Sequence, residues 1–158
     1  MKALLLLCLT GCLQIEAEIE ESCVTRSGVE VAGVELSSLS QTFMIDDLSE
    51  VHRFTDNADA DIQFVRATIR PTSGVTSLAF VEAASVVIEG ETVYACAGDC
   101  PSGEGVELPS QTRTDAMKYL SADALAFTLS VDGELPKTAW TVDVDVCVRG
   151  NVSYSSAR

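Results

Sequence analysis

Apolar and polar residues alternate along much of this chain with the period of two that is typical of β-strands. The alternation is clearest over Leu125 to Val131 and over Trp140 to Val148, with a break at Asp132-Gly133. We expect these two segments to form strands that face each other. Shorter runs of the same kind predict further strands at 13–20, 24–34, 42–45, 62–69 and 91–95.

Glycine and proline mark where these strands turn or end. Ser27-Gly28 and Gly33 predict a turn within 24–34, and Arg70-Pro71 predicts the end of the strand at 62–69. The apolar segment 78–88 fits a helix or a buried strand, and the β-branched residues near its end favour a strand there.

The second half of the chain has one long irregular segment. Glycine and proline are frequent from Cys96 to about residue 110, which predicts the main loop. A short helix is expected over 114–120, with Thr114 as its N-cap. With seven or eight short strands, the chain is predicted to be all-β, an antiparallel β-sandwich of immunoglobulin-like architecture.

The first residues have a different pattern, typical of an export signal. Lys2 precedes an apolar run that ends in Leu9-Thr10-Gly11-Cys12, and the run is too short to span a bilayer. The tetrad resembles the lipobox of bacterial lipoproteins. The resemblance implies a signal peptide at 1–11, a lipid-modified Cys12 carrying a palmitate-type acyl chain, and a single domain over 12–158.

Location follows from the same resemblance. Leu13 is not the aspartate that retains many lipoproteins in the inner membrane, so the cell outer membrane is favoured, with the protein anchored in the envelope by lipid. Ordinary secretion with a later cut is the alternative, although Glu16 and Glu18 leave a small-residue cleavage site near Ala17 hard to place. No flexible tract follows Cys12, so we expect the domain to sit close to the lipid.

The charge is strongly acidic and limits the partners. The chain has 24 acidic and 10 basic residues, a net charge of −14. Loss of Lys2 with the signal brings the exported chain near −15. This charge argues against nucleic acid and against direct docking on anionic lipid, so the acyl chain must hold the protein at its membrane. An envelope protein remains the expected partner, of unknown identity.

Four cysteines remain once Cys8 and Cys12 are set aside, an even number suited to an oxidising compartment. Four cysteines allow three pairings, and we favour Cys23 with Cys147 and Cys96 with Cys100. Strict alternation places Cys23 on the buried side of its strand and Cys147 on the polar side. The first pairing therefore requires a β-bulge near Glu20-Glu21 that changes the parity.

Other chemistry of the cysteines is less well supported. Zinc at Cys96 and Cys100 needs further ligands, but His52 is the only histidine. A redox pair is also disfavoured, because three residues separate these cysteines instead of two and no helix obviously follows them.

The polar stretch before the strand at 62–69 is the candidate metal site. Asp56, Asn57, Asp59 and Asp61 bring four oxygen-bearing side chains together, as calcium prefers, but the spacing does not match a helix-loop-helix calcium loop. A solvated turn is the simpler interpretation. Apart from calcium, no cofactor is expected.

Catalytic groupings are weak. His52 has no nucleophile motif near it, and Asp143 and Asp145 share one strand face, as acidic solvent-facing positions commonly do. We therefore expect no enzyme but a structural or binding module; a calcium-dependent adhesin-like protein and a hydrolase are the alternatives. The binding loop of such a module is expected to contain Gly98, Asp99, Pro101, Gly103 and Gly105.

From Asp46 onward the order of features also resembles a group of small lipoproteins from myxobacteria and related bacteria. The shared features are Phe54, Asp56 and Asn57 before the strand at Ile62, a glycine turn and apolar run over 74–88, and the amphipathic pair over 127–148. The resemblance covers most of the exported chain. It implies a β-sandwich and assigns no activity.

Overall fold

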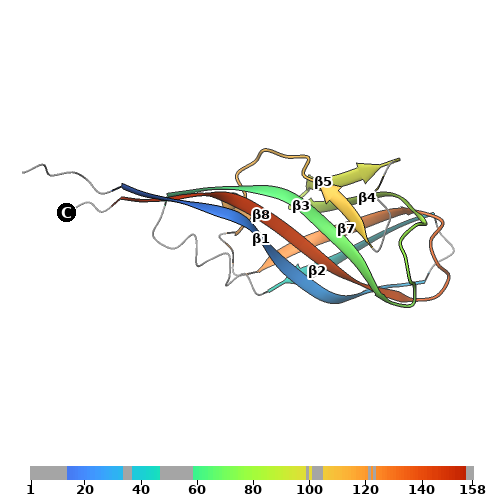
Figure 1. Ribbon diagram of the computed structural model, residues 1–158. Helices are drawn as coiled ribbons and strands as arrows, with labels where there is room; N and C mark the ends of the chain where they lie inside the picture. Colours follow the sequence, from blue (N-terminus) through green and yellow to red (C-terminus); the bar gives the residue numbers. More distant parts are fainter. Residues whose placement is uncertain are drawn as a thin grey trace, which may run out of the picture.

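The structure is a computed structural model that describes residues 14–33, 37–46, 59–98, 100, 105–120, 122 and 124–155. The expected signal peptide, Cys12 and His52 lie outside these residues. The described residues form eight strands and one helix of a single turn, and the strands make two antiparallel four-stranded sheets (Figure 1). The predicted antiparallel β-sandwich is confirmed.

Each sheet combines strands from both halves of the chain. The first has the order β1-β8-β3-β6 and the second the order β2-β7-β4-β5. The elements are β1 (Gln14–Val31), β2 (Ser38–Ile45), β3 (Asp59–Ser73), β4 (Val81–Ile88), β5 (Glu91–Ala97), β6 (Val106–Pro109), α2 (Met117–Leu120), β7 (Leu125–Gly133) and β8 (Trp140–Ser155).

The pairing of strands is that of a double-sheet jelly roll. β1 pairs with β8, β2 with β7, β3 with β6 and β4 with β5, as if one long antiparallel hairpin had been rolled up. Rolling then brings β3 beside β8 and β4 beside β7. In immunoglobulin domains the sheets are instead ABED and CFG. The sandwich is therefore of the jelly-roll type, and its strand order differs from that of immunoglobulin domains.

The core lies between the two sheets and is lined by alternate residues of each strand. In β8 the inward positions from Trp140 to Val148 are all buried, as the sequence predicts. Aromatic rings join the sheets: Phe64 of β3 meets Tyr94 of β5 edge to face, with ring centroids 5.6 Å apart. At the other end Phe80 meets Trp140 in the same way at 5.3 Å. Burying each such side chain contributes about 1.5–3 kcal/mol.

The bulge expected near Glu20-Glu21 is present. The register of β1 against β8 shifts between Ile19 and Ser22, so Glu20 and Glu21 together face Arg149. The shift places Cys23 opposite Cys147 and on the same sheet face, which removes the parity conflict.

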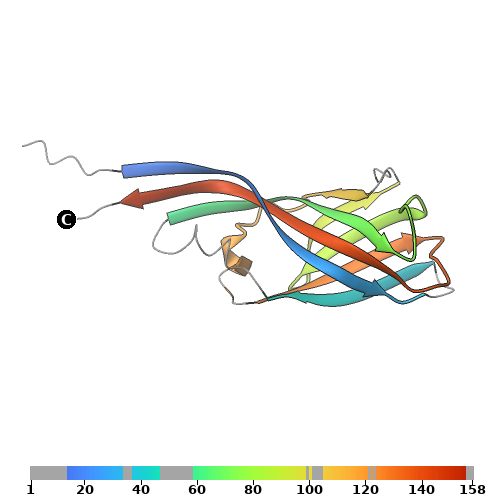
Figure 2. The same ribbon diagram turned by 60° about the horizontal axis from the view of Figure 1, so that its bottom comes forward.

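Beyond this bulge the first sheet continues as a three-stranded projection, which we call the arm. The arm comprises 14–20 of β1, 59–63 of β3 and 149–155 of β8. It extends past the rest of the sandwich on the side where β1 begins (Figure 2). A second bulge, between Phe64 and Arg66 of β3, lies at nearly the same level, and bulges increase local twist.

Three predicted strand boundaries are wrong. β1 runs through Ser27-Gly28 as one strand. Gly28 takes a positive φ of 66° in another bulge of β1, between Arg26 and Val29, and not in a turn. β3 continues past Pro71 to Ser73, since β6 pairs only with residues 66–69 and the proline meets no ladder on that side. β3 also begins at Asp59 and not at Ile62, because its first residues pair with β8.

The remaining corrections concern β4, the helix and the last two strands. The segment 78–88 is strand from Val81 onward. The helix is a single turn over 117–120, and its cap is Asp115, whose Oδ1 accepts the Met117 N–H at 3.0 Å. Thr114 is not the cap, because its hydroxyl donates a hydrogen bond to Glu91. β7 and β8, which the alternation predicted to face each other, lie in the two different sheets of the sandwich.

Candidate functional site

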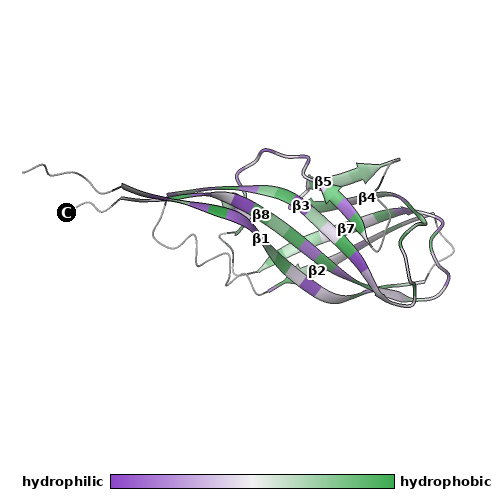
Figure 3. Cartoon of the chain, in the orientation of Figure 1, coloured by the Kyte–Doolittle hydropathy of each residue, from purple (hydrophilic) through white to green (hydrophobic). Residues whose placement is uncertain are grey.

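The two sheets present very different outer surfaces. Purple and green bands alternate along β1, β8 and β3 in Figure 3, because the outward positions of this sheet are strongly polar. We call this surface the charged face. Ten carboxylates and three guanidinium groups lie on these outward positions: Glu16, Glu18, Glu20, Glu21, Glu30, Asp59, Asp61, Arg66, Arg70, Glu107, Asp143, Asp145 and Arg149.

Arg66 joins three strands on the charged face. Its Nε donates to Glu21 Oε1 at 2.8 Å, and its Nη1 donates to Glu107 Oε2 at 3.0 Å. The hydrogen bond that Arg66 donates to Glu21 is the main reason why the pKa of Arg66 is raised. The bulge in β1 aims Glu21 across β8 toward Arg66. These side chains are 34% to 51% exposed, so we expect them to align strands more than to add stability.

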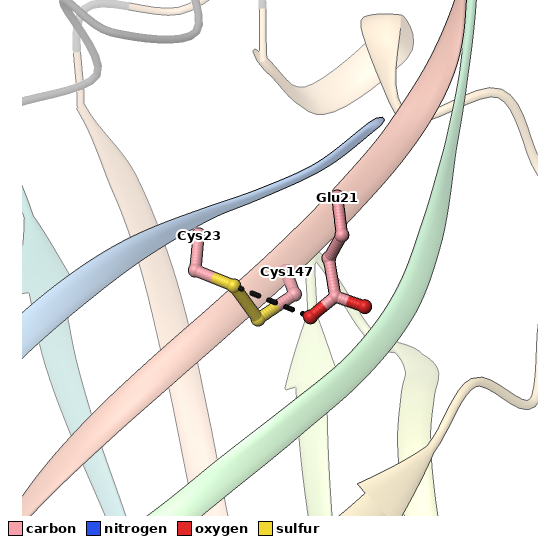
Figure 4. A group of neighbouring side chains, drawn as sticks. All are labelled: Glu21, Cys23 and Cys147. Carbon is pink, nitrogen blue, oxygen red and sulfur yellow. Dashed lines mark hydrogen bonds between the residues drawn. A yellow bond between two sulfur atoms is a disulfide. The ribbon is translucent and has the colours of Figure 1, made fainter. Parts of the chain in front are cut away.

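The disulfide between Cys23 and Cys147 lies beside Glu21 on the charged face (Figure 4). Glu21 Oε1 comes within 3.6 Å of Cys23 Sγ. Because a disulfide sulfur carries no proton, this approach is a polar contact and not a conventional hydrogen bond. In the described chain, these three residues are the closest gathering of potential metal ligands, but oxidation leaves them no thiolate. The predicted Cys23–Cys147 and Cys96–Cys100 bonds are both confirmed.

Asp143 and Asp145, paired by sequence, have separate structural partners. Asp145 is only 7% exposed, where it accepts from Arg70 at 2.6 Å and from Thr25 at 2.7 Å. The expectation of a solvent-facing Asp145 is wrong, because Arg70 and Thr25 from the flanking strands cover it. Asp143 accepts the Gly28 N–H at 2.9 Å in the second β1 bulge. Both carboxylates are thus occupied in holding strands together.

The candidate calcium ligands are only partly described. Asp56 and Asn57 lie outside the described residues. Asp59 and Asp61 are exposed on β3, in the arm, and not in a turn. Extended backbone separates them by about 6.6 Å along the strand, so they do not converge as ligands of a calcium loop do. The register sets Ser153 and Asn151 of β8 beside them, and Glu16 and Glu18 beyond. Calcium binding remains a prediction.

The ends of the predicted binding loop are fixed to neighbouring strands. Gly98 has a positive φ of 80°, and its N–H donates to Glu82 O at 3.0 Å. Gly105 lies so close to Ile69 that a Cβ would come within 2.7 Å of its carbonyl oxygen. Asp99, Pro101 and Gly103 are outside the described residues. Recognition by this loop is therefore still a prediction.

A polar cluster that the sequence pattern did not predict surrounds Glu91 at the start of β5. Its carboxylate accepts hydrogen bonds from the hydroxyl groups of Thr112, Thr114 and Tyr119. These hydrogen bonds, with that of Thr112 the largest influence, lower the pKa of Glu91 from its ordinary 4.5 to about 2. The Lys118 ammonium lies 4.7 Å from the centre of the Tyr119 ring. The cluster fastens the segment before α2 to the second sheet.

The outer surface of the second sheet, which we call the neutral face, is nearly free of charge. Small and hydroxyl-bearing residues occupy its outward positions. Asp132 is the only charged residue among them, and Glu82, exposed in the β4 bulge between Val81 and Ala83, adds a second carboxylate beside them. The neutral face comprises Ser38, Ser40, Thr42 and Met44 of β2, Ala126, Thr128, Ser130 and Asp132 of β7, Ala83, Ser85 and Val87 of β4, and Thr92, Ala95 and Ala97 of β5.

Strand pairing aligns the hydroxyl groups of the neutral face in rows. Ser40 and Ser130 share a hydrogen bond of 3.0 Å across β2 and β7, and Thr42 and Thr128 share another of 3.0 Å. Met44, at the end of the same strand, is 46% exposed and is the only large hydrophobic side chain exposed to this degree in the described parts of the chain. Sequence reasoning missed this surface, although serine and threonine at the polar positions of alternating strands were its visible signal.

Comparisons with known proteins add no function. No protein-family model and no curated protein matches this chain. Among helices in the described regions, none is suited to crossing a bilayer.

Three solved structures are similar in outline. The decameric BFDV capsid protein is 10% identical, with a TM-score of 0.44 over 89% of this chain and 99% of that chain. Desmodium yellow mottle tymovirus is 12% identical, with a TM-score of 0.36 over 98% and 95%. Turnip yellow mosaic virus is 14% identical, with a TM-score of 0.32 over 99% and 87%. At these values the jelly-roll assignment rests on the strand order of this chain.

Proposed function

We propose that this chain is a non-enzymatic, lipid-anchored protein of the bacterial outer membrane that serves as a structural or binding module. The observation that carries the proposal is the tetrad Leu9-Thr10-Gly11-Cys12, followed two residues later by β1 at Gln14. An acyl chain on Cys12 would be joined to the arm through Leu13 alone. Two or more such chains anchor a protein stably.

The arm gives the proposed anchor a rigid spacer in place of a flexible tether. Residues 14–19 of β1 pair with β8 throughout, and at about 3.3 Å per residue they cover roughly 20 Å. Glu16, Glu18, Asp59 and Asp61 line one side of the arm. Anionic headgroups repel these carboxylates, which favours a sandwich held away from the lipid surface by the length of the arm, and not in the close contact that the missing tether alone predicts.

The partners of the charged groups support a non-enzymatic role. Asp145 is held by Arg70 and Thr25, and Asp143 by the Gly28 backbone. A pair of catalytic carboxylates needs free oxygens that converge on a substrate. These two instead bind the strands beside them, as structural groups do.

The anchor is tested by the mass of the mature protein and by its location. We expect intact-mass spectrometry of the natural product to find an acylated N-terminal Cys12, and an alkyne-labelled palmitate to be incorporated. Cys12→Ser should abolish labelling and leave the protein in the soluble fraction. Cys8→Ser, a matched change within the expected signal, should be labelled normally. An unmodified Cys12 sulfur, or a different N-terminus, contradicts the proposal.

The binding role is tested separately on the loop between Cys96 and Pro109. Residues 101–104 are replaced by glycine and serine, with the Cys96–Cys100 bond kept, and partners are crosslinked in intact cells. We expect a specific crosslink to be lost, whereas replacing Glu89 and Gly90 in the β4–β5 turn should preserve it. A crosslink that survives the loop replacement removes this loop from consideration.

A further inference from the structure

The Cys23–Cys147 disulfide lies on the charged face, and its two ends differ in their access to solvent. Cys23 is exposed on β1, an edge strand of the first sheet. Cys147 is only 1% exposed, although it occupies an outward position of β8. β8 is an inner strand, and its register sets Cys147 between Cys23 of β1 and Arg66 of β3. A reagent in solution therefore reaches Cys23 more readily than Cys147.

A side-chain bridge between Glu21 and Arg66 adds to this difference. The two residues come from β1 and β3, the strands on either side of β8, and Arg66 Nε donates to Glu21 Oε1 at 2.8 Å. A carboxylate oxygen of Glu21 also lies within 4.8 Å of both sulfur atoms (Figure 4). The bridge thus crosses the strand that carries Cys147 and holds a negative charge against the disulfide.

We propose that the Cys23–Cys147 disulfide is a thiol-exchange site, at which Cys23 accepts a small incoming thiol and Glu21 selects against anionic thiols. The thiolate of the partner forms a bond to Cys23 Sγ, the S–S bond breaks, and its electron pair leaves on Cys147 Sγ. Cys147 then takes up the proton that the partner thiol released. The products are a mixed disulfide on Cys23 and a buried Cys147 thiol.

The strand pairing makes this step reversible. The Cα atoms of Cys23 and Cys147 are 4.0 Å apart, and the ladder continues on both sides, at Ser22 and Val24. After exchange the Cys147 thiol therefore stays beside the mixed disulfide. Its thiolate attacks Cys23 Sγ, restores the original bond and releases the partner as a thiolate. The site thus carries a thiol adduct for a limited time, and complete reduction requires a second thiol.

The charge around the disulfide determines which thiols react. The charged face holds ten carboxylates against three guanidinium groups, and Glu21 Oε1 lies 3.6 Å from Cys23 Sγ. Like charges a few ångströms apart in water slow an approach by about fivefold. Every attacking thiolate meets this repulsion, a further negative group on the thiol increases it, and an ammonium group offsets it. We therefore expect aminothiols to react best.

The direction of exchange is tested on residues 12–158 with Cys12→Ser, which retain every described element and carry no lipid. The folded protein is exposed briefly to 2-mercaptoethanol, quenched with acid and mapped by peptide mass spectrometry, and we expect the adduct on Cys23. Single-cysteine variants give a second measure. The Cys23 thiol left by Cys147→Ala should react with an aromatic disulfide reagent at least about tenfold faster than the Cys147 thiol left by Cys23→Ala, because Cys147 is buried.

The selection by Glu21 is tested with three thiols of different charge: cysteamine, 2-mercaptoethanol and 2-mercaptoethanesulfonate. Glu21→Gln should speed exchange with the sulfonate most, by at least about threefold, and exchange with cysteamine least. Comparing wild type with the variant for each thiol cancels the intrinsic reactivity of that thiol. Glu107→Gln is the matched control, because Glu107 is the other carboxylate bound to Arg66 but lies on β6, beyond β3. It should leave the rates nearly unchanged.

Three results would overturn the proposal. They are an adduct found mainly on Cys147, equal reactivity of the two single-cysteine variants, and equal effects of Glu21→Gln and Glu107→Gln on the three thiols. Exchange that proceeds only through the unfolded chain would give the first two, since unfolding exposes both sulfur atoms alike. If a cysteine variant fails to fold, the glutamate variants, which keep the disulfide, still decide. Because the protein used has no anchor, no result depends on lipidation.

Discussion

Removing the Cys23–Cys147 disulfide should destabilise the domain far more than removing Cys96–Cys100. The first bond joins residues 124 positions apart, and the second joins residues only 4 apart. In the chain-entropy description a disulfide stabilises by restricting the unfolded chain, and the restriction grows with the logarithm of the closed loop. This relation gives about 5 kcal/mol for the long loop and about 2 kcal/mol for the short one.

The perturbation is therefore a pair of double variants, Cys23→Ala with Cys147→Ala and Cys96→Ala with Cys100→Ala. Strand pairing on both sides of the long-range bond, at Ser22 and Val24, remains available in the first variant. Removing this disulfide is thus expected to lower the free energy of unfolding and to leave the fold unchanged. For a domain of this size, 5 kcal/mol corresponds to a melting temperature lower by roughly 10–20 °C.

The assay is urea unfolding of both variants and of wild type, with and without a reductant. Reductant should lower the wild-type midpoint to near that of a variant that lacks all four cysteines. Reductant should lower the urea midpoint of the Cys96→Ala/Cys100→Ala variant by almost as much, because that protein still contains the long-range bond for the reductant to break. Equal losses from the two double variants, or a larger loss from the short loop, would refute the assignment of stability to loop closure.

Three other predictions follow from the structure. Glu91→Gln should lower the melting temperature at neutral pH. The difference in melting temperature from wild type should shrink as pH falls from about 4.5 toward about 2, because the folded-state pKa of Glu91 is about 2 and protonation of the carboxylate removes the hydrogen bonds that stabilise wild type. A difference that is constant with pH contradicts this. If Asp59 and Asp61 bind calcium, millimolar calcium should raise the melting temperature of wild type but not of Asp59→Asn/Asp61→Asn, and no shift in either ends the calcium hypothesis. Gly133→Ala should cost at least about 2 kcal/mol in urea unfolding, since φ is +146° there and a Cβ would meet Phe80 O at 2.0 Å; an unchanged midpoint would mean that this backbone relaxes freely.

Several features of the fold were predictable because they are local properties of the chain. Alternation along 140–148 identified β8 and its inward side chains, since successive residues of a strand point to opposite faces. The conflict in parity between Cys23 and Cys147 predicted a bulge near Glu20-Glu21, and the register shifts there. The even number of cysteines that remains once Cys8 and Cys12 are set aside also suggested the two bonds that are found.

The candidate surfaces were less predictable because they depend on which strands become neighbours. Thr42 and Thr128 are 86 residues apart and form one row of the neutral face only because β2 pairs with β7. Asp145 looks like a solvent-facing residue in the sequence, yet Arg70 and Thr25 arrive from two flanking strands and cover it. Glu91 likewise has no sequence signal for a lowered pKa, since its partners follow it by 21 to 28 residues.

The sequence by itself determined that this chain forms antiparallel strands with one buried face, and that its cysteines pair. Each of those properties depends on the spacing of residues along a single strand. Only the tertiary structure decided the jelly-roll order, the projecting arm and the separation of a charged face from a neutral one. Alternation marks which side of a strand is buried, but pairing depends on contacts across long loops, and any strand with the same period satisfies the pattern equally well.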